Sequence, residues 1–201
     1  GVLITGMEAT PREFMLYLPL HNPVSSLEIG IMKGGSISPA PARPTGRKSI
    51  VFYGTSITHG FSASRSGMTH VAMLGRTFSR EVINLGFSGN GRMDAAVGEL
   101  LTEVDAAVYV IDCLPNMQPA DVTAKCIPLV KQLRAAKPNT PIILVEDRRF
   151  TNEWITPAKK KFHDDNHAAL RAAFEQLQKE GVANLSYISG DHLYGDDTDG
   201  A

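Results

Sequence analysis

A serine directly follows an apolar run in the stretch FYGTSITHG, residues 52–60. The run SIVFYG predicts a buried strand, and Ser56 lies in the turn that comes after it. A hydroxyl at the carboxyl end of a strand is exposed at the sheet edge. The positive end of the following helix stabilises an alkoxide or oxyanion there. Ser56 is therefore a candidate nucleophile, although capping a helix is an equally common role for serine.

Hydrogen-bond donors follow the next two apolar runs. The segment NLGFSGNGR, residues 84–92, contains Gly89, whose N–H can approach a ligand closely because glycine has no side chain. The segment DCLPNM, residues 112–117, contains Asn116, whose carboxamide is also a donor. The amides of Ser56 and Gly89 and the Asn116 side chain are the kind of donors that an oxyanion hole requires. Each feature alone is common, because glycine often serves a turn and asparagine often caps a helix.

Alternating strand and helix patterns would position these residues. Apolar runs predict strands at residues 49–53, 82–87, 107–113, 141–147 and 185–189. Helical spacing of apolar residues predicts helices around residues 71–78, 97–104, 122–133 and 170–177, the third kinked or irregular at Pro128. We therefore predict an α/β protein with three α/β/α layers and a mostly parallel five-stranded sheet. In such sheets ligands bind outside the carboxyl ends of the strands, where the three candidates fall.

The first 46 residues have a different pattern. Apolar stretches at residues 13–20 and 26–32, separated by the turn-rich sequence HNPVS, predict a β-hairpin. A proline- and glycine-rich segment, residues 33–48, predicts a linker. We therefore expect a domain boundary, with residues 1–46 in one unit and residues 47–201 in another.

Composition narrows the classes of function. The chain has 20 basic and 21 acidic residues without a large basic cluster, so no nucleic-acid partner is predicted. No apolar run reaches about 18 residues, so no membrane span is predicted. Cys113 and Cys126 lie among apolar residues, which favours core positions over redox or nucleophilic roles. Without a phosphate-binding Gly-Lys-Ser/Thr loop, no cofactor is predicted.

A group of acidic residues and histidines lies in the last predicted helix. Asp164 and Asp165, with His163 and His167, suggest metal ligands on one helix. An acidic helix start that complements the helix dipole is the favoured interpretation. No metal site is therefore predicted.

The candidate residues match a known family when they are taken in order. Ser56 in GTSIT, Gly89 in NLGFSGNG, Asn116 in LPN and Asp199 in TDG resemble the four sequence blocks of the SGNH hydrolases, also called GDSL-type esterases and lipases. The stretches FYGTSITHGFSASRSGM, INLGFSGNGRM and DCLPNM look like the branch of GDSL-like lipase/acylhydrolases that carries a β-sandwich domain before the hydrolase domain. The resemblance covers about residue 48 to the end. It implies a flavodoxin-like SGNH sheet, with the hairpin as a remnant of the sandwich.

The resemblance implies a role for each matching residue. Ser56 would be the nucleophile, and the amides of Ser56 and Gly89 with Asn116 would form the oxyanion hole. Asp199 would orient the general-base histidine. The last block of the family is Asp-x-x-His, which places that histidine directly after Ala201, outside the sequence.

This sequence departs from the family pattern in three ways. Thr55 replaces the aspartate of GDS, the third block lacks the form GGND, and the histidine is missing. A serine nucleophile needs a base within hydrogen-bond reach, so we expect the sequence to be a piece of a longer protein. The alternatives for the base are His59, one turn after Ser56, and His192, which is close in sequence to Asp199.

These inferences predict a serine esterase that cleaves a small acyl ester, preferably acetyl on a carbohydrate, through an acyl-enzyme. Arg65, Asn90 and Arg92 lie in loops near the expected pocket and are candidate substrate-binding residues, although solvated arginines are common on surfaces. The alternatives are a non-catalytic module that binds a glycan or a partner, and an acyltransferase. The resemblance favours a periplasmic or extracellular location, and the oligomeric state stays open.

Overall fold

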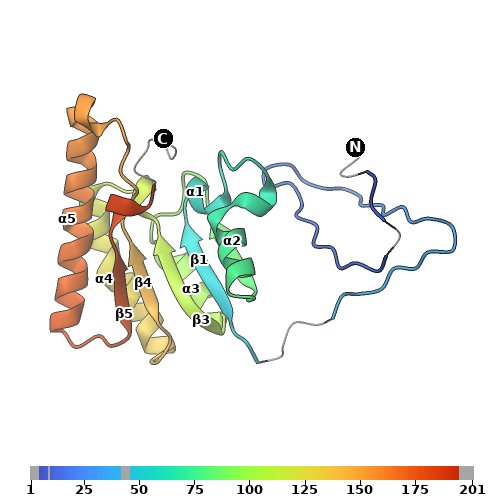
Figure 1. Cartoon of the computed structure of the whole chain (residues 1–201). Helices are drawn as coiled ribbons and strands as arrows, with labels where there is room; N and C mark the ends of the chain where they lie inside the picture. Colours follow the sequence, from blue (N-terminus) through green and yellow to red (C-terminus); the bar gives the residue numbers. More distant parts are fainter. Residues whose placement is uncertain (1–4, 9, 42–45, 195–201) are drawn as a thin grey trace.

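A five-stranded sheet forms the centre of the protein (Figure 1). The structure is a computed structural model that describes residues 5–8, 10–41 and 46–194. The strands lie in the order β2-β1-β3-β4-β5, which is the flavodoxin-like order, and every neighbouring pair is parallel. Their bounds are β1 (Ser49–Gly54), β2 (Val82–Gly86), β3 (Ala106–Asp112), β4 (Ile142–Val145) and β5 (Leu185–Ile188). The predicted five strands are confirmed, and the sheet is entirely parallel.

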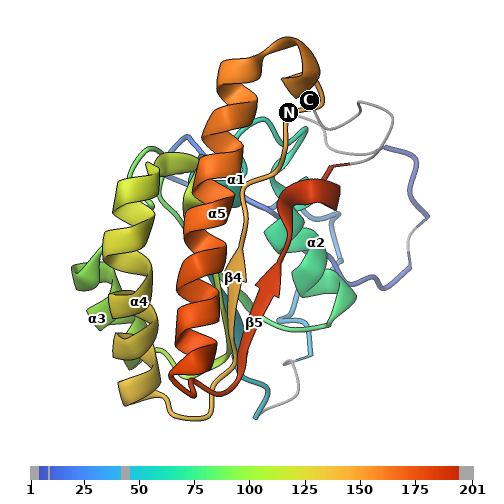
Figure 2. The same cartoon turned by 90° about the vertical axis from the view of Figure 1, so that its left-hand side faces the viewer.

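Helices lie on both faces of the sheet, but unequally. The last three pack on one face around a single apolar core, and Figure 2 shows α4 and α5 side by side over it. The second helix packs on the other face against β1. The five helices are α1 (Ser56–His59), α2 (His70–Thr77), α3 (Ala95–Glu103), α4 (Pro119–Ala136) and α5 (Pro157–Lys179). Short 3₁₀ turns are η1 (Ser66–Met68), η2 (Leu114–Asn116), η3 (Glu153–Ile155) and η4 (Gly190–His192).

The central strands are buried on both sides, as parallel strands usually are. In β3 the side chains of Tyr109 and Ile111 enter the core under the three-helix face. Val110, between them, faces the opposite side, where α2 packs. The Tyr109 hydroxyl lies 2.7 Å from the carbonyl oxygen of Val104, and this contact ties the end of α3 to the sheet. Helix α4 runs through Pro128 as one 18-residue helix, so the predicted irregularity does not end it.

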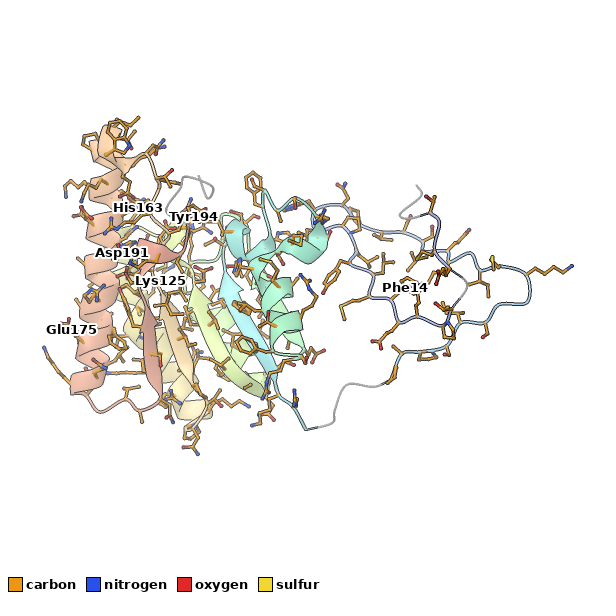
Figure 3. All side chains as sticks on the ribbon, viewed as in Figure 1. Phe14, Lys125, His163, Glu175, Asp191 and Tyr194 are labelled. Atoms are coloured by element: carbon orange, nitrogen blue, oxygen red, sulfur yellow. The ribbon has the colours of Figure 1, made fainter. Side chains whose placement is uncertain are left out.

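The predicted β-hairpin in residues 13–32 is wrong. These residues form no strand, and Figure 1 shows them in a loop that projects from the α2 side of the protein, away from the sheet. Phe14 is 67% exposed, and Figure 3 shows it on this segment, apart from the strands. A two-stranded hairpin is at best marginally stable without an apolar surface to cover it. The segment instead contacts the α/β unit through single groups, such as the Tyr17 hydroxyl, which accepts a hydrogen bond from Arg76 at 3.0 Å.

The end of β1 is packed too closely for a side chain. A Cβ atom on Gly54 would overlap the Thr58 side chain and lie 2.7 Å from the carbonyl oxygen of Asp112. This space lets the Thr58 hydroxyl donate a hydrogen bond of 2.8 Å to the Asp112 carboxyl group. The bond joins α1, which begins at Ser56, to the end of β3.

We expect Gly54→Ala to lower the free energy of unfolding by about 1–3 kcal/mol, because the added methyl group must displace Thr58 or the β3 backbone. The midpoint of urea unfolding, followed by circular dichroism, measures the effect. Gly30→Ala is the control, because nothing lies within 4 Å of its Cβ position. Equal midpoints for the two variants would contradict the close packing described here.

Candidate active site

Ser56 is the first residue of α1, and only Thr55 separates it from the end of β1. Thr55 caps the helix, since its hydroxyl oxygen accepts a hydrogen bond from the Ile57 N–H at 3.2 Å. The capping role proposed for Ser56 is therefore taken by its neighbour. Thr55 is fully buried while Ser56 is half-buried. The Ser56 hydroxyl is thus left available for chemistry.

The loop after β2 lies directly on the end of β1. The Phe87 N–H donates a hydrogen bond of 2.9 Å to the Gly54 carbonyl oxygen. A Cβ atom on Gly91 would overlap that same carbonyl group, so only glycine allows this approach. The N–H groups of Asn90 and Gly91 both donate to the Phe87 carbonyl oxygen. Gly89 is exposed, with φ +73°, and its N–H finds no acceptor within residues 5–8, 10–41 and 46–194.

Asn116 comes from the third strand end, on the short turn η2. Its side-chain nitrogen lies 3.4 Å from the Phe87 carbonyl oxygen, so the loops after β2 and β3 meet. Asn116 is half-buried, like Ser56. The two residues line one hollow of about 580 Å³. Gly89 lies in the adjoining loop, two residues after Phe87.

The fourth strand end contributes residues to the same hollow that the sequence reasoning missed. Asp147 and Arg148 are the second and third residues after β4, and His163 of α5 lines the same hollow. His163 is buried; its Nε2 lies 3.5 Å from an Asp147 carboxylate oxygen, and its Nδ1 contacts the Glu153 carboxylate. Figure 3 shows His163 at the same end of the molecule as Tyr194. The sequence feature that could have identified these residues is the charged segment EDRR, residues 146–149, which directly follows an apolar run.

A buried carboxylate fixes the loop that follows β5. Glu146, 1% exposed, accepts hydrogen bonds from Arg171 and from the Gly190 N–H, both at 2.7 Å, and from the Tyr187 hydroxyl. Burial opposes its ionisation, but the bonds from Tyr187 and Gly190 and the charges of His167 and Arg171 lower the pKa of Glu146 overall. The ionised group therefore holds the chain at η4.

The structure describes the two alternative base histidines of the expected triad, but not its acid, Asp199. Asp199 lies outside the described residues, so its role stays a prediction. Nε2 of His59 is 2.7 Å from the Leu20 carbonyl oxygen, which directs this ring to the N-terminal segment. His192 is exposed in η4.

The three candidate substrate-binding residues lie outside the wall that Ser56 and Asn116 share. Arg65 lines a separate hollow with Tyr17 and Arg76. Asn90 and Arg92 are exposed in the loop after β2. They lie close to the hollow in sequence, but the structure does not place them in its wall.

Other candidate groups have structural partners. Asp164 pairs with Lys160 at 2.6 Å and with Arg149 at 2.9 Å. Helix α5 begins at Pro157 and has no acidic residue in its first turn, so the interpretation of Asp164 and Asp165 as an acidic helix start is wrong. Cys113 and Cys126 are buried and unbonded to each other. Burial raises the pKa of Cys126 to about 12 and that of Cys113 further, so both thiols stay protonated in the core.

One protein family and several solved structures are similar to this chain. The model of the GDSL-like Lipase/Acylhydrolase family matches residues 47–201. A protein from Bacteroides ovatus ATCC 8483, described as a GDSL-like lipase, is 36% identical over 77% of this chain and 46% of its own, with a TM-score of 0.74. No curated protein sequence matches the chain.

Two further solved structures share the fold at lower identity. The salicylyl-acyltransferase SsfX3 of a tetracycline biosynthetic pathway is 22% identical over 76% of this chain and 45% of its own, with a TM-score of 0.67. A family two carbohydrate esterase from Clostridium thermocellum is 17% identical over 78% of this chain and 57% of its own, with a TM-score of 0.57. The present chain therefore spans about half the length of these proteins. Among its described helices, none has the length and apolar character to cross a membrane.

We expect Asp112→Asn to change how stability depends on pH. Burial raises the pKa of Asp112 to about 7, from 3.8. The folded state then binds a proton that the unfolded state releases, so stability falls as pH rises from about 4 to about 7. Asparagine cannot ionise, so the variant should gain about 2–3 kcal/mol relative to the native chain between pH 5 and pH 8.

Urea unfolding at both pH values measures this gain. Asp105→Asn is the control, because the exposed Asp105 carboxylate pairs with Lys48, which lowers its pKa and keeps it ionised at both pH values. A constant stability difference between Asp112→Asn and the native chain at the two pH values would contradict the raised pKa of the Asp112 carboxyl group.

Proposed function

Since the chain belongs to the GDSL-like lipase/acylhydrolase family, we propose that it is a serine esterase with Ser56 as its nucleophile. One observation carries the proposal: the Ser56 hydroxyl, free of the capping role, lies on the same hollow as the Asn116 carboxamide. The hollow is at the carboxyl ends of parallel strands, where α/β proteins bind ligands. The N–H of Gly89, which has no acceptor among the described residues, adds a third donor in the adjoining loop.

The proposed reaction has two steps. The Ser56 oxygen attacks the ester carbonyl carbon while a histidine takes the hydroxyl proton, and the resulting oxyanion accepts hydrogen bonds from Asn116 and from the amides of Ser56 and Gly89. The C–O bond to the alcohol breaks, and the alcohol leaves with that proton. Water then attacks the acyl-serine and releases the acid. Asp199 and a histidine directly after position 201 are the proposed orienting acid and base.

The preferred substrate is a small acyl ester, and an acetyl ester of a carbohydrate is the first choice. A carbohydrate esterase shares the fold, which is compatible with this choice. At 17% identity this similarity supports the fold and not the substrate. Membership of the branch with a leading β-sandwich, and the division at residue 46, are part of the same proposal. Transfer of the acyl group to a hydroxyl acceptor other than water would use the same serine.

We expect Ser56→Ala to lower the rate of p-nitrophenyl acetate hydrolysis by at least about 10³-fold, because the acyl-enzyme cannot form. The rate is measured by release of p-nitrophenolate, with the protein expressed from its complete natural reading frame. Ser186→Ala, an exposed serine on β5, is the matched control. Equal rates for Ser56→Ala and the native protein would remove Ser56 as nucleophile and favour a binding module.

We expect Asn116→Ala to lower kcat by about 10²–10³-fold with a smaller change in KM, because its amide stabilises charge that develops in the transition state. Steady-state kinetics on the same ester separate the two constants. Asn139→Ala, in the loop before β4, is the control. A rise in KM at constant kcat would instead assign Asn116 to ground-state binding.

A further inference from the structure

We propose that the hollow beside Ser56 binds a carboxylate group of the substrate through Arg148 and Lys159. The inference rests on the proposed esterase function and names its substrate class: an ester that carries a carboxylate on its acyl or its alcohol part. Both cations line the hollow that Ser56 and Asn116 share. They reach it from different elements, Arg148 from the end of β4 and Lys159 from the first turn of α5.

The two cations are held against one aromatic ring. The Arg148 guanidinium lies 4.4 Å from the centre of the Phe150 ring, and the Lys159 ammonium lies 5.0 Å from it. Each such contact is favourable, but two like charges near one ring repel each other. An anion in the hollow relieves this repulsion. Phe150 itself lines the hollow, so the cations and the ring form one wall.

The wall carries more positive than negative charge. Asp147 is its single acidic residue among the described lining residues, and it is 2% exposed. Its carboxylate already contacts Arg148 and lies 3.5 Å from Nε2 of His163. Lys159 forms no ion pair with any residue that the structure describes. The wall thus holds one carboxylate and two cationic side chains, Arg148 and Lys159, and a second carboxylate would balance the charge.

The Arg148 side chain is held in place before any ligand binds. Its Nη1 donates to the Asp147 carboxylate, and its side chain is only 16% exposed. The planar guanidinium has five N–H donors, and one bond to Asp147 leaves others for a planar acceptor such as a carboxylate. Lys159 supplies a point charge from the exposed rim. A fixed guanidinium and an exposed ammonium group on one wall suit a carboxylate at the mouth of the hollow.

Two pairs of esters locate the charge on the substrate. The acyl arm compares mono-p-nitrophenyl glutarate with p-nitrophenyl butyrate. The alcohol arm compares 4-acetoxybenzoate with its methyl ester. In each arm the measured quantity is the ratio of kcat/KM for the charged ester to that for the neutral ester, on the protein expressed from its complete natural reading frame.

We expect the native protein to prefer the charged ester in one arm, and Lys159→Met to lower that ratio about 5- to 10-fold. Lys161→Met is the matched control, because Lys161 lies two residues away and pairs with Asp165 at 2.6 Å. Arg148→Met should lower the ratio further; if it fails to fold after loss of the Asp147 contact, Lys159→Met decides alone. An unchanged ratio in Lys159→Met, or no charge preference in either arm, would overturn the inference.

A binding measurement separates this inference from the esterase proposal. Isothermal titration calorimetry with glutarate or benzoate measures this binding. If no ester is hydrolysed but Lys159→Met weakens carboxylate binding and Lys161→Met does not, the anion site stands and the esterase function fails. If Lys159→Met binds carboxylates as the native protein does, the anion site is wrong whether or not esters are cleaved.

Discussion

The close packing of backbone around Gly54 is the constraint on which the site depends. The loop after β2 approaches so closely that Gly91 has no room for a side chain, and the Thr58 side chain fills the space that a Cβ atom on Gly54 would need. The Thr58 hydroxyl then bonds to Asp112. These contacts join the carboxyl ends of β1, β2 and β3. The segment that carries Ser56 is fixed by backbone contacts and by the Thr55 and Thr58 side chains rather than by the Ser56 side chain, which leaves the Ser56 hydroxyl free to react.

Buried charged residues after β4 lie on the other side of the hollow. Glu146 and Asp147 are almost fully buried at the end of β4, where unpaired charges would be costly. Cationic partners surround them, with Arg171 on the first and Arg148 on the second. The first pair, together with the Gly190 N–H, holds the chain after β5, and the second holds a wall of the hollow. The charged pair that holds the fold and the charged pair that lines the hollow are therefore neighbours at the end of β4.

The sequence predicted the sheet, and it predicted that Ser56 and Asn116 of the candidate site lie near each other, for a clear physical reason. Buried parallel strands need long apolar runs, and the carboxyl ends of those runs meet at one edge, so Ser56 and Asn116 could be placed together without coordinates. Whether Ser56 or Thr55 caps α1 could not be decided, because both residue types cap helices. The hairpin failed because apolar alternation in residues 13–32 is the same with or without a partner sheet. Asp147 and Arg148 were missed because charged residues after a strand usually indicate a solvated turn, and only burial reveals otherwise.

The identity of the nucleophile is the central claim, and covalent labelling tests it most directly. Diethyl p-nitrophenyl phosphate transfers a diethylphosphoryl group to an activated serine and releases p-nitrophenolate. After the complete protein is treated, digested and analysed by tandem mass spectrometry, this account predicts the adduct on the peptide that contains Ser56, at one group per chain. An adduct on another serine, or an unlabelled protein under conditions that label a known serine esterase, would contradict it.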